Sequence, residues 1–336
     1  MIKKVLIVSA ITIVIFLLFS YFNSKIEEYH KESALKRIHL WDFRSVDTVK
    51  YSRDLAREMM EDQEFDTIIS KQVSDIALLG ASHIAISTPY DAEFLPFLKR
   101  WVTVAREKNL KVWFRGNFSC WENWFGYERM TREEHKILLK EFIENNPGLF
   151  EDGDIFTSCP ECENGGPGDP RHNGDVIGHR KFLIDEYNIS KESFANIDKQ
   201  VQPGFYSMNY DVATLVMDED TTNKLGNLVV IDHYIKDPEK LAKDARKIAE
   251  KSKGEVVLGE FGAPIPDIHG AMTDKAQADW INQALQEVSL VEEVTGVNYW
   301  TNVGGSTELW NSGGTPKAAV DMIREYYKKT KLISPR

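Results

Sequence analysis

Short apolar runs alternate with amphipathic stretches along most of this chain. Each run spans about four to six residues, is rich in β-branched or aromatic side chains, and is nearly all apolar until its C-terminal end. Continuous runs of this kind are typical of parallel strands that are covered on both faces. We predict eight such strands, at Ile38–Phe43, His83–Ser87, Lys111–Arg115, Ile155–Ser158, Gly204–Met208, Leu228–His233, Glu255–Glu260 and Val297–Trp300.

The segments between the predicted strands carry signals for the start of helices. Thr131-Arg132-Glu133-Glu134 has the pattern of a capping box, and Asp237-Pro238 combines a cap with a first-turn proline. Asp91 precedes an apolar stripe at helical spacing. Thr315-Pro316 is expected to open the last helix, whose inner face would be formed by Ala319, Val320, Ile323 and Tyr326.

Eight strands that alternate with helices predict βαβ units, and eight such units predict an α/β fold of the (β/α)8 barrel type over residues 37–330. The alternative is an open, doubly wound sheet. Such sheets usually have a glycine-rich phosphate turn after the first strand, and Trp41-Asp42-Phe43-Arg44-Ser45 contains no glycine. The barrel is therefore the favoured architecture.

The N-terminal segment differs from the rest of the chain. Twenty consecutive uncharged residues, from Val5 to Ser24, would span roughly 30 Å as a helix, which matches the core of a bilayer. Lys3 and Lys4 precede this run and favour a cytoplasmic N-terminus. We therefore expect a transmembrane signal anchor over residues 1–24, a stalk over 25–36, and an extracytoplasmic barrel at the cell membrane. A cleaved signal peptide is the alternative, although Phe22-Asn23-Ser24 is a poor cleavage site.

Composition and charge narrow the range of functions. Apolar residues make up 42% of the chain, which is ample for a core, and the net charge of −11 argues against binding nucleic acid, which requires a basic face. The eight histidines are scattered and form neither an H-x-H nor an H-E-x-x-H pair, so metal-dependent hydrolysis is not indicated. We expect a monomer that needs no cofactor.

Three cysteines are too few for a disulfide framework. Cys159 and Cys162 form a C-x-x-C motif, and Cys120 lies elsewhere in the chain. Because no second ligand pair follows the motif, it is a weak zinc signal. We expect ordinary packing or one disulfide from Cys120 to either Cys159 or Cys162, with a metal site as the alternative.

Active sites of (β/α)8 barrels lie at the C-terminal ends of the strands. Polar and aromatic residues accumulate there, and two carboxylates are prominent among them, Glu161 after the fourth strand and Glu260 at the end of the seventh. They lie 99 residues apart (260 − 161), which corresponds to about three βα units. We therefore expect the two side chains to face each other across the barrel.

Two carboxyl groups on either side of a cavity are able to cleave an acetal, one as nucleophile and one as general acid and base. Retention of configuration needs a separation of about 5–5.5 Å, which opposite strand ends of an eight-stranded barrel can provide. The nucleophile must be ionised, and Arg115 and the Tyr234 hydroxyl are expected to stabilise that charge on Glu260. The acid must keep its proton near neutral pH, which burial and a neighbouring negative charge favour.

The motifs at these strand ends resemble those of clan A glycoside hydrolases, in particular the cellulases and mannanases of family 5. Leu258-Gly259-Glu260-Phe261-Gly262 is similar to the strand-seven nucleophile motif, and His233-Tyr234 to the strand-six motif. Trp300 is similar to the strand-eight tryptophan beside the scissile bond, and Arg115 to the arginine that supports the nucleophile. The resemblance covers roughly residues 37–328. It implies a retaining glycoside hydrolase with Glu260 as nucleophile and Glu161 as acid/base.

One position departs from the pattern of the family. Clan A enzymes usually have Asn-Glu after strand four, where the asparagine contacts the sugar, and this chain has Pro160-Glu161. Asn164 is a candidate for the missing contact, and Glu163 is a second candidate for the acid. Glu161 is favoured because Glu163 lies two residues further into the loop. Trp121 and Trp124, in an aromatic loop after strand three, are candidates for stacking on sugar rings.

The predicted function is hydrolysis of O-glycosidic bonds in a β-linked oligo- or polysaccharide by double displacement. The missing asparagine before Glu161 leaves open a barrel that binds carbohydrate at the cell surface without cleaving it. A transglycosylase that uses the same two carboxylates is a third hypothesis, which the size of the products and not the sequence would distinguish. Each hypothesis predicts a carbohydrate partner at the same rim.

Overall fold

The computed structural model describes residues 20–22, 25, 36–48, 56–118, 128–165 and 168–333. One compact unit comprises Trp41–Lys328, and a second contains the segments on either side of it. In that second unit, β1 (Lys36–His39) pairs in antiparallel fashion with β10 (Thr330–Ile333). Within the described residues, no helix has the length and apolar character needed to cross a bilayer. The anchor and stalk predicted over residues 1–36 lie almost entirely outside the described ranges and stay predictions.

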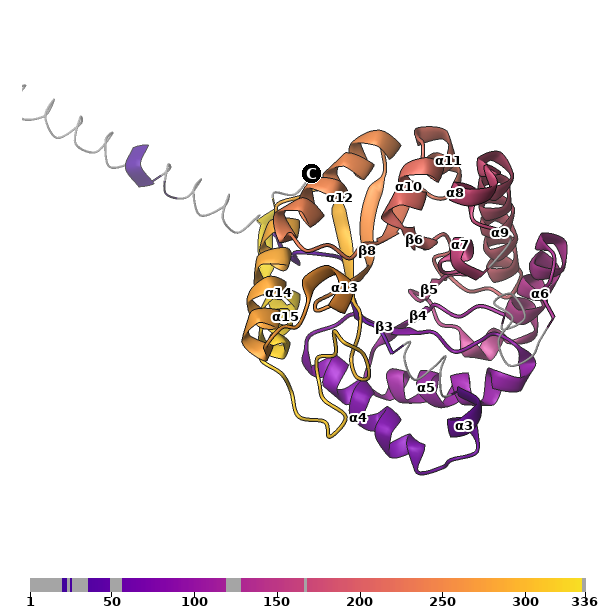
Figure 1. Cartoon of the computed structure of the whole chain (residues 1–336), viewed down its shortest axis with the longest axis horizontal. Helices are drawn as coiled ribbons and strands as arrows, with labels where there is room; N and C mark the ends of the chain where they lie inside the picture. The colour runs from indigo at the N-terminus through magenta and orange to yellow at the C-terminus, as the bar shows by residue number, and fades with distance from the viewer. Residues whose placement is uncertain are drawn as a thin grey trace, which may run out of the picture. The chain divides into compact units, whose positions relative to one another are not determined.

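Parallel strands form the centre of the larger unit (Figure 1). They run in the order β2-β9-β8-β7-β6 and β3-β4-β5. Bridges between Asp47 and Ala85, and between Ile155 and Gln202, join the two sheets, so the described strands close into a barrel. The strands are β2 (Phe43–Val46), β3 (His83–Ile86), β4 (Lys111–Phe114), β5 (Ile155–Phe156), β6 (Ser207–Asn209), β7 (Leu228–Asp232), β8 (Glu255–Phe261) and β9 (Val294–Tyr299). The predicted α/β barrel of parallel strands is therefore confirmed.

The first barrel strand is the one whose predicted position is wrong. The sequence predicts it at Ile38–Phe43, whereas β2 covers Phe43–Val46 and residues 36–39 form β1 of the other unit. The apolar run is split because residues 36–39 pair with β10, whereas the backbone of Asp42 pairs with Thr295 and Phe43 lies in the barrel core. As a result, the residue at the C-terminal end of the first barrel strand is Asp47, five positions beyond Asp42.

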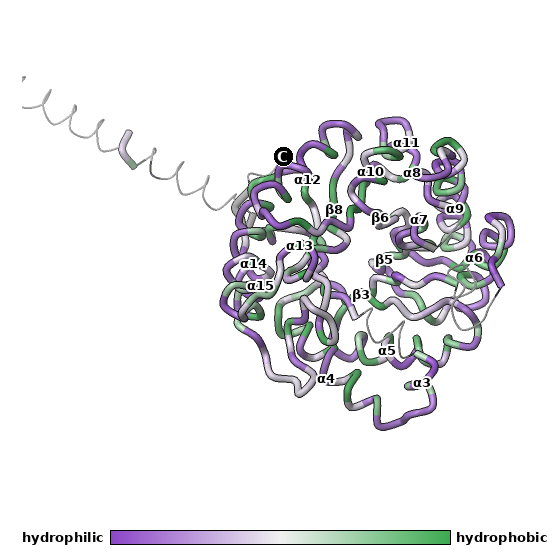
Figure 2. The backbone as a smooth tube through the Cα atoms, in the orientation of Figure 1, coloured by the Kyte–Doolittle hydropathy of each residue, from purple (hydrophilic) through white to green (hydrophobic). Residues whose placement is uncertain are grey.

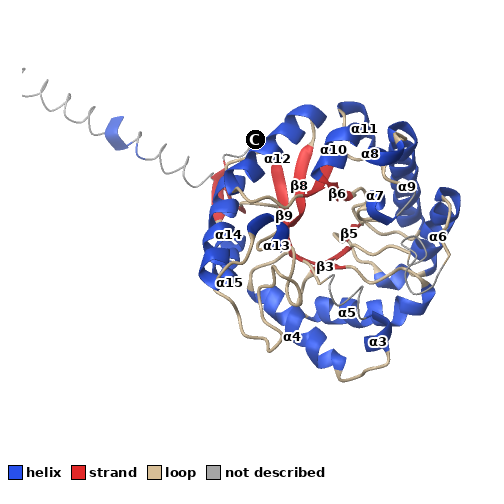
Figure 3. Cartoon of the chain, in the orientation of Figure 1, coloured by secondary structure: helices blue, strands red, loops and turns tan. Residues whose placement is uncertain are grey.

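Helices follow the strands and form a layer outside them (Figure 3). Their colours in Figure 2 change repeatedly between hydrophilic and hydrophobic along the chain, as expected for helices with one buried face. The longer helices are α4 (Phe65–Leu78), α5 (Leu95–Glu107), α6 (Arg132–Asn145), α9 (Val176–Asn196), α12 (Pro238–Ser252), α14 (Asp274–Val288) and α15 (Ala319–Lys328). Shorter segments are α3 (Ala56–Met60), η1 (Ala92–Phe94), η3 (Pro147–Leu149), α7 (Cys162–Gly165), α8 (Pro170–Asn173), α10 (Tyr210–Val216), α11 (Glu219–Lys224) and α13 (Pro266–His269).

Two predicted helix starts are confirmed by their hydrogen bonds. The Thr131 hydroxyl accepts a bond from the backbone of Glu134, whose carboxylate accepts one from the backbone of Thr131, so a capping box opens α6. Asp237 accepts a bond from the first turn of α12, in which Pro238 lies. Both helices therefore begin where polar side chains replace the missing backbone partners of the first turn.

The last helix begins later than predicted. The sequence predicts a start at Thr315-Pro316, whereas α15 begins at Ala319. Pro316 instead forms an antiparallel bridge with Trp310, which keeps this segment extended. The predicted inner face is confirmed, because the side chains concerned are all buried: Ala319, Val320, Ile323 and Tyr326.

One layer of large side chains fills the barrel interior. Phe43 and Trp113 meet edge to face at a centroid distance of 5.1 Å, an arrangement that stabilises aromatic pairs by about 0.5–1.5 kcal/mol. Gly296 of β9 leaves room for this ring, because a Cβ atom there would lie 2.7 Å from Phe43. The other buried members of the layer are Ala85, Ile155, Phe205, Val230 and Val257.

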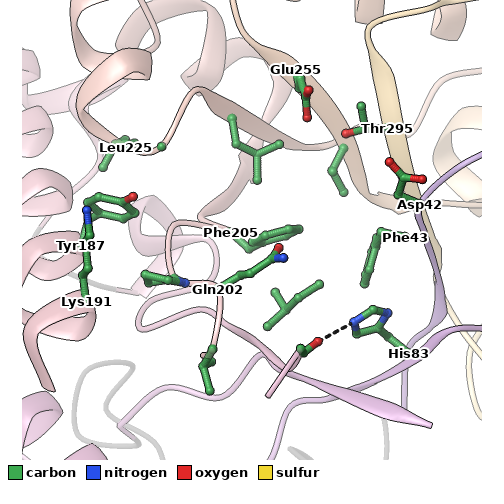
Figure 4. A pocket seen from close by; sticks show the side chains of 17 residues that line it. Asp42, Phe43, His83, Tyr187, Lys191, Gln202, Phe205, Leu225, Glu255 and Thr295 are labelled. Carbon is green, nitrogen blue, oxygen red and sulfur yellow. Dashed lines mark hydrogen bonds between the residues drawn. The ribbon is translucent and has the colours of Figure 1, made fainter. Parts of the chain in front are cut away.

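A cavity of about 540 Å³ opens at the N-terminal ends of the strands (Figure 4). His83 and Glu255, the first residues of β3 and β8, contribute to its lining. The His83 ring contacts the carbonyl oxygen of Gly153 at 3.1 Å, and burial lowers its pKa to about 4. This end of a (β/α)8 barrel generally serves stability, and the polar residues discussed below lie at the opposite end.

Candidate active site

A buried guanidinium is the centre of the candidate site. Arg115 directly follows β4, and its Nη1 donates a hydrogen bond of 2.7 Å to Oε1 of Glu260. The same nitrogen contacts the carboxylate of Asp47. Nη2 lies 2.8 Å from Oγ of Ser207 and 3.2 Å from Oδ2 of Asp232. One cation therefore holds three carboxyl groups that come from three different strand ends.

Strand geometry explains why these side chains converge. Successive side chains of a strand point to opposite faces, so Val230, Asp232 and the following Tyr234 share the face that points into the barrel. Val230 lies in the interior layer of the barrel, below Asp232. Asp232 is also the register partner of Glu260 on the neighbouring strand. Adjacent strand ends thus deliver two carboxyl groups and a phenol to one point of the rim.

Both oxygens of the Glu260 carboxylate have a hydrogen-bond donor. Arg115 binds Oε1, and the Tyr234 hydroxyl donates a bond of 2.7 Å to Oε2. The Tyr234 ring contacts Trp300 edge to face, with ring centroids 6.1 Å apart. Glu260 keeps 9% of its surface exposed. A carboxylate held in this way is fixed in orientation and still accessible, which suits a nucleophile.

Burial and mutual charge set the protonation states of the groups around Glu260. Although burial opposes the charge on Arg115, Glu260 and Asp47 raise the pKa of its guanidinium, which therefore stays protonated. Burial, together with the negative charge of Glu260, raises the pKa of Asp232 well above its usual range. The same two causes raise the pKa of the Tyr234 phenol. Burial and the neighbouring charge of Glu260 therefore both favour the protonated form of Asp232.

Glu161 approaches the same cluster from the fourth barrel strand. It lies between β5 and α7, and its backbone nitrogen donates a hydrogen bond of 2.8 Å to the carbonyl oxygen of Ser207. Its negative charge contributes to the raised pKa values of both Asp232 and Tyr234. The Glu161 carboxyl group therefore lies within electrostatic reach of the residues that surround Glu260.

Glu163 and Asn164 have a different environment. Oε1 of Glu163 accepts hydrogen bonds from the backbone and side-chain nitrogens of Asn209, at 2.7 Å and 3.1 Å. Asn164 accepts a longer bond of 3.3 Å from the same Asn209 side chain. Glu163 is buried, and this burial raises its pKa. Both residues thus hold the end of β6 in place. Of the two candidate acids, Glu161 is the one whose charge acts on Asp232 and Tyr234.

His233 lies outside the cluster around Arg115. His233 directly follows Asp232, the last residue of β7, so the two side chains point to opposite faces of the strand. Its Nε2 lies 3.0 Å from Oδ2 of Asp244 on α12, and its ring stacks on Tyr210 at a centroid distance of 4.4 Å. The sequence predicts His233 as a substrate contact, whereas its observed partners connect the strand to the surrounding helices.

Of the three tryptophans predicted at the site, one lies within the described residues. Trp300 follows β9 at the rim, and its ring contacts Tyr234. Trp121 and Trp124 lie outside the described residues, so their predicted stacking on sugar rings stays a prediction.

The C-x-x-C motif forms a disulfide. Cys159 is bonded to Cys162, which corrects the expected pairing of either residue with Cys120. Cys120 lies outside the described residues. Because the bond uses both thiols of the motif, neither is free to act as a zinc thiolate. The pair flanks Pro160 and Glu161, so the disulfide closes the loop that carries the candidate acid.

Four polar residues of the site escaped prediction. Asp47, Ser207 and Asp232 contact Arg115, and the Asn298 side chain donates a hydrogen bond of 2.7 Å to the backbone of Gly259. Asp232 could have been predicted from strand alternation, since it lies two residues before Tyr234 and its side chain is therefore on the same face. Asp47 was missed because the first barrel strand was placed too early.

No protein-family model and no curated protein sequence matches the chain, whereas solved structures match its fold. The family 5, subfamily 18 glycoside hydrolase of Streptomyces cattleya, in complex with GlcNAc, has a TM-score of 0.65 at 12% identity over 88% of this chain and 82% of that one. The subfamily 18 protein of Bifidobacterium longum subsp. longum, in complex with Manβ1-4GlcNAc, has a TM-score of 0.59 at 13% identity. This match covers 85% of this chain and 78% of that one. An exo-β-1,4-mannosidase of Opitutaceae bacterium strain TAV5 has a TM-score of 0.61 at 13% identity, and the match covers 85% of this chain and 59% of that one.

These similarities are structural, because the identities of 12% and 13% are too low to compare side chains position by position. They extend over 85% to 88% of this chain. The structural neighbours are family 5 and other clan A glycoside hydrolases, and this chain shares their (β/α)8 barrel fold.

Proposed function

We propose that this protein is a retaining glycoside hydrolase with Glu260 as nucleophile and Glu161 as general acid and base. The observation that carries the proposal is the double hydrogen bonding of Glu260 by Arg115 and Tyr234 at the C-terminal end of a barrel strand. The proximity of the Glu161 charge to the same cluster supports the second role. The shared fold with family 5 enzymes supports the reaction class.

In the first step, an oxygen of Glu260 attacks the anomeric carbon and the glycosidic C–O bond breaks. Glu161 transfers its proton to the departing oxygen, so the aglycone leaves as an alcohol and a glycosyl ester of Glu260 remains. In the second step, Glu161 takes a proton from water, whose oxygen attacks the anomeric carbon and displaces Glu260. Arg115 and Tyr234 stabilise the carboxylate that is released.

The substrate class is a β-linked glycan, and the neighbours suggest which to test first. One structural neighbour is an exo-β-1,4-mannosidase, and another was solved with Manβ1-4GlcNAc. We therefore propose β-mannosides as the first members of a substrate panel that continues with β-glucosides and β-glucuronides. A neighbour described as a β-glucuronidase motivates the last of these.

The test begins with a 2-deoxy-2-fluoro glycoside that carries an activated leaving group. Such a reagent should label residue 260 covalently, as read by peptide mass spectrometry, and Glu260→Gln should abolish both labelling and turnover. Labelling of another carboxylate, or full turnover by Glu260→Gln, would exclude this nucleophile. Turnover without labelling at 260 would argue for a different mechanism at the same rim.

The assignment of the acid is tested separately. With Glu161→Ala, azide should restore turnover of a dinitrophenyl glycoside and yield a glycosyl azide, because a small anion needs no base to attack the intermediate. Glu163→Gln is the matched control and should lack this rescue. The opposite result would transfer the role to Glu163. Glycan binding without any turnover would favour the non-catalytic alternative, and products longer than the substrate would favour transglycosylation.

We also propose that the barrel is extracytoplasmic and tethered by residues 1–24. The apolar run from Val5 to Ser24 and the disulfide support this location, since disulfides persist in oxidising compartments. The full chain should resist alkaline extraction from membranes and should retain its N-terminal peptide in mass spectra. A released chain that lacks this peptide would instead identify a cleaved signal.

A further inference from the structure

The disulfide between Cys159 and Cys162 encloses the proposed acid. Only Pro160 and Glu161 lie between the two cysteines, and both cysteine side chains are buried. We propose that this disulfide is a positioning device that holds the Glu161 carboxyl group toward Glu260 and thereby sustains proton transfer to poor leaving groups. The inference rests on the proposed function, because it assigns a device to the acid of that mechanism.

The backbone of Glu161 is the first observation behind this inference. Its φ is +45°, in the left-handed region that residues with a Cβ atom rarely adopt. Such conformations persist only where the surrounding structure imposes them, and they are concentrated at functional sites. A glutamate that is held in this region therefore needs a specific constraint.

Four features constrain the loop, and the disulfide joins its two ends. The Cα atoms of Cys159 and Cys162 are 5.3 Å apart, and the ring of Pro160 restricts φ directly before Glu161. The Glu161 nitrogen donates to the carbonyl oxygen of Ser207, and the Glu161 carbonyl oxygen accepts from Asn164, each at 2.8 Å. Opening the disulfide would leave the proline and two hydrogen bonds to hold a conformation that the chain does not favour.

The conformation of Glu161 decides where its side chain points. Relaxation of φ to the usual negative region would rotate the Cα–Cβ bond away from its present direction, in which the Glu161 charge reaches Asp232 and Tyr234. The two hydrogen bonds to Glu260 should persist, because their donors Arg115 and Tyr234 follow β4 and β7 and lie outside this loop. Loss of the disulfide should therefore weaken the acid and spare the nucleophile.

The closed loop is too short for the disulfide to act mainly through the unfolded chain. Cross-links restrict the unfolded ensemble more when they close longer loops, and this one joins residues three positions apart. Its main effect should therefore be local geometry, which is the effect that a positioning role requires.

The experiment compares two substrates with the same sugar. Dinitrophenolate departs without a proton, whereas phenolate needs one, so kcat/KM for the phenyl glycoside reports on the acid and kcat/KM for the dinitrophenyl glycoside reports on the nucleophile. The enzyme is assayed oxidised, after reduction by a phosphine, and as the Cys159→Ser/Cys162→Ser variant. The Cys120→Ser background ensures that the reductant acts only on the pair, and mass spectrometry counts the free thiols.

Opening the disulfide should lower kcat/KM for the phenyl glycoside about 10- to 100-fold and leave the dinitrophenyl glycoside within about twofold. Equal losses on both substrates, or no loss on either, would overturn the positioning role. If the double variant does not fold, the reduced enzyme decides, provided that its circular dichroism matches that of the oxidised form. If the oxidised enzyme hydrolyses neither substrate, the proposed function fails first, and the positioning role fails with it.

Discussion

The hydroxyl of Tyr234 donates a hydrogen bond of 2.7 Å to Oε2 of Glu260. Because Arg115 occupies the other carboxylate oxygen, Glu260 is clamped between donors that follow β4 and β7. Hydrogen bonds to an ionised group are shorter and stronger than those between neutral groups. This clamp fixes the orientation of the Glu260 carboxylate, and it leads to the first two predictions.

Tyr234→Phe should lower kcat/KM about 10- to 100-fold. The substitution removes a hydrogen bond to a charged group, which contributes about 1.5–3 kcal/mol, and each 1.4 kcal/mol is a factor of ten. Steady-state kinetics check the loss. Tyr299→Phe is the matched control, since it removes a bond of 2.7 Å to the backbone of Thr307 and should affect thermal stability and not kcat/KM. Equal kinetic losses in both variants would exclude a specific role for Tyr234.

Arg115→Lys should destabilise the fold by about 3–5 kcal/mol and abolish most activity. A lysine keeps the positive charge but cannot reproduce the forked contacts of the guanidinium to Glu260, Asp47 and Asp232, so buried carboxyl groups lose hydrogen-bond donors. Urea denaturation measures the change. In Arg171→Lys, the altered ion pairs with Asp169 and Asp211 lie at the surface and should cost less than about 1 kcal/mol. Similar losses in the two variants would contradict the central role of Arg115.

Asp232→Asn should become increasingly more stable than the wild type as the pH rises. Burial and the charge of Glu260 raise the pKa of Asp232, so between its usual value of 3.8 and the raised value the folded protein binds more protons than the unfolded chain. The stability of the wild type therefore falls as pH rises through this window, whereas asparagine does not titrate. Urea denaturation at a series of pH values from about 4 to 8 provides the comparison.

Asp244→Asn is the matched control for that series, with the opposite sign. Although burial opposes the charge on Asp244, hydrogen bonds from Lys240 and His233 lower its pKa. The stability that it contributes is lost as pH falls through this lowered value, so relative to the wild type this variant should lose stability as pH rises from about 2 to about 5 and should stay level above that range. The series for this variant is therefore extended down to about pH 2. Parallel trends in the two variants would refute a proton on Asp232.

Gly259→Ala should destabilise the protein by about 1–3 kcal/mol through overpacking. A Cβ atom at this position would lie 2.5 Å from Oδ1 of Asp232 and 2.7 Å from Cγ1 of Val230. Gly148→Ala is the control, because no atom lies within 4 Å of the corresponding Cβ. Thermal unfolding of the two variants tests the prediction, and a wild-type melting temperature for Gly259→Ala would show that the carboxyl group of Asp232 moves freely.

Seven of the eight barrel strands were predicted within a few residues, because strands covered on both faces are apolar along their whole length. The first strand was misplaced since Ile38–Phe43 also reads as one apolar run. The backbone separates it into β1, which pairs with β10, and β2, which begins at Phe43. Long-range pairing with the C-terminal residues decides that boundary, and no local pattern reveals it.

The site was predictable where one residue marks a strand end, as for Arg115 and Glu260. The site was harder to predict where two adjacent residues are both polar. The strand-six motif drew attention to His233 and Tyr234, whereas the contact of Asp232 with Arg115 was not predicted. The direction of Glu161 depends on a positive φ and a disulfide, and neither can be derived from the spacing of C-x-x-C alone.

Asp47 and Asn298 come within hydrogen-bonding range although 251 positions separate them along the chain. The contacts of Asp47 are therefore complete only after β9 has joined β2. A nascent polypeptide that has emerged from the ribosome as far as β8 already contains Glu260 and lacks the neighbour that closes the ring. Contacts between such distant residues form slowly during folding, so the complete rim around Asp47 should be the last part of the site that the newly made protein acquires.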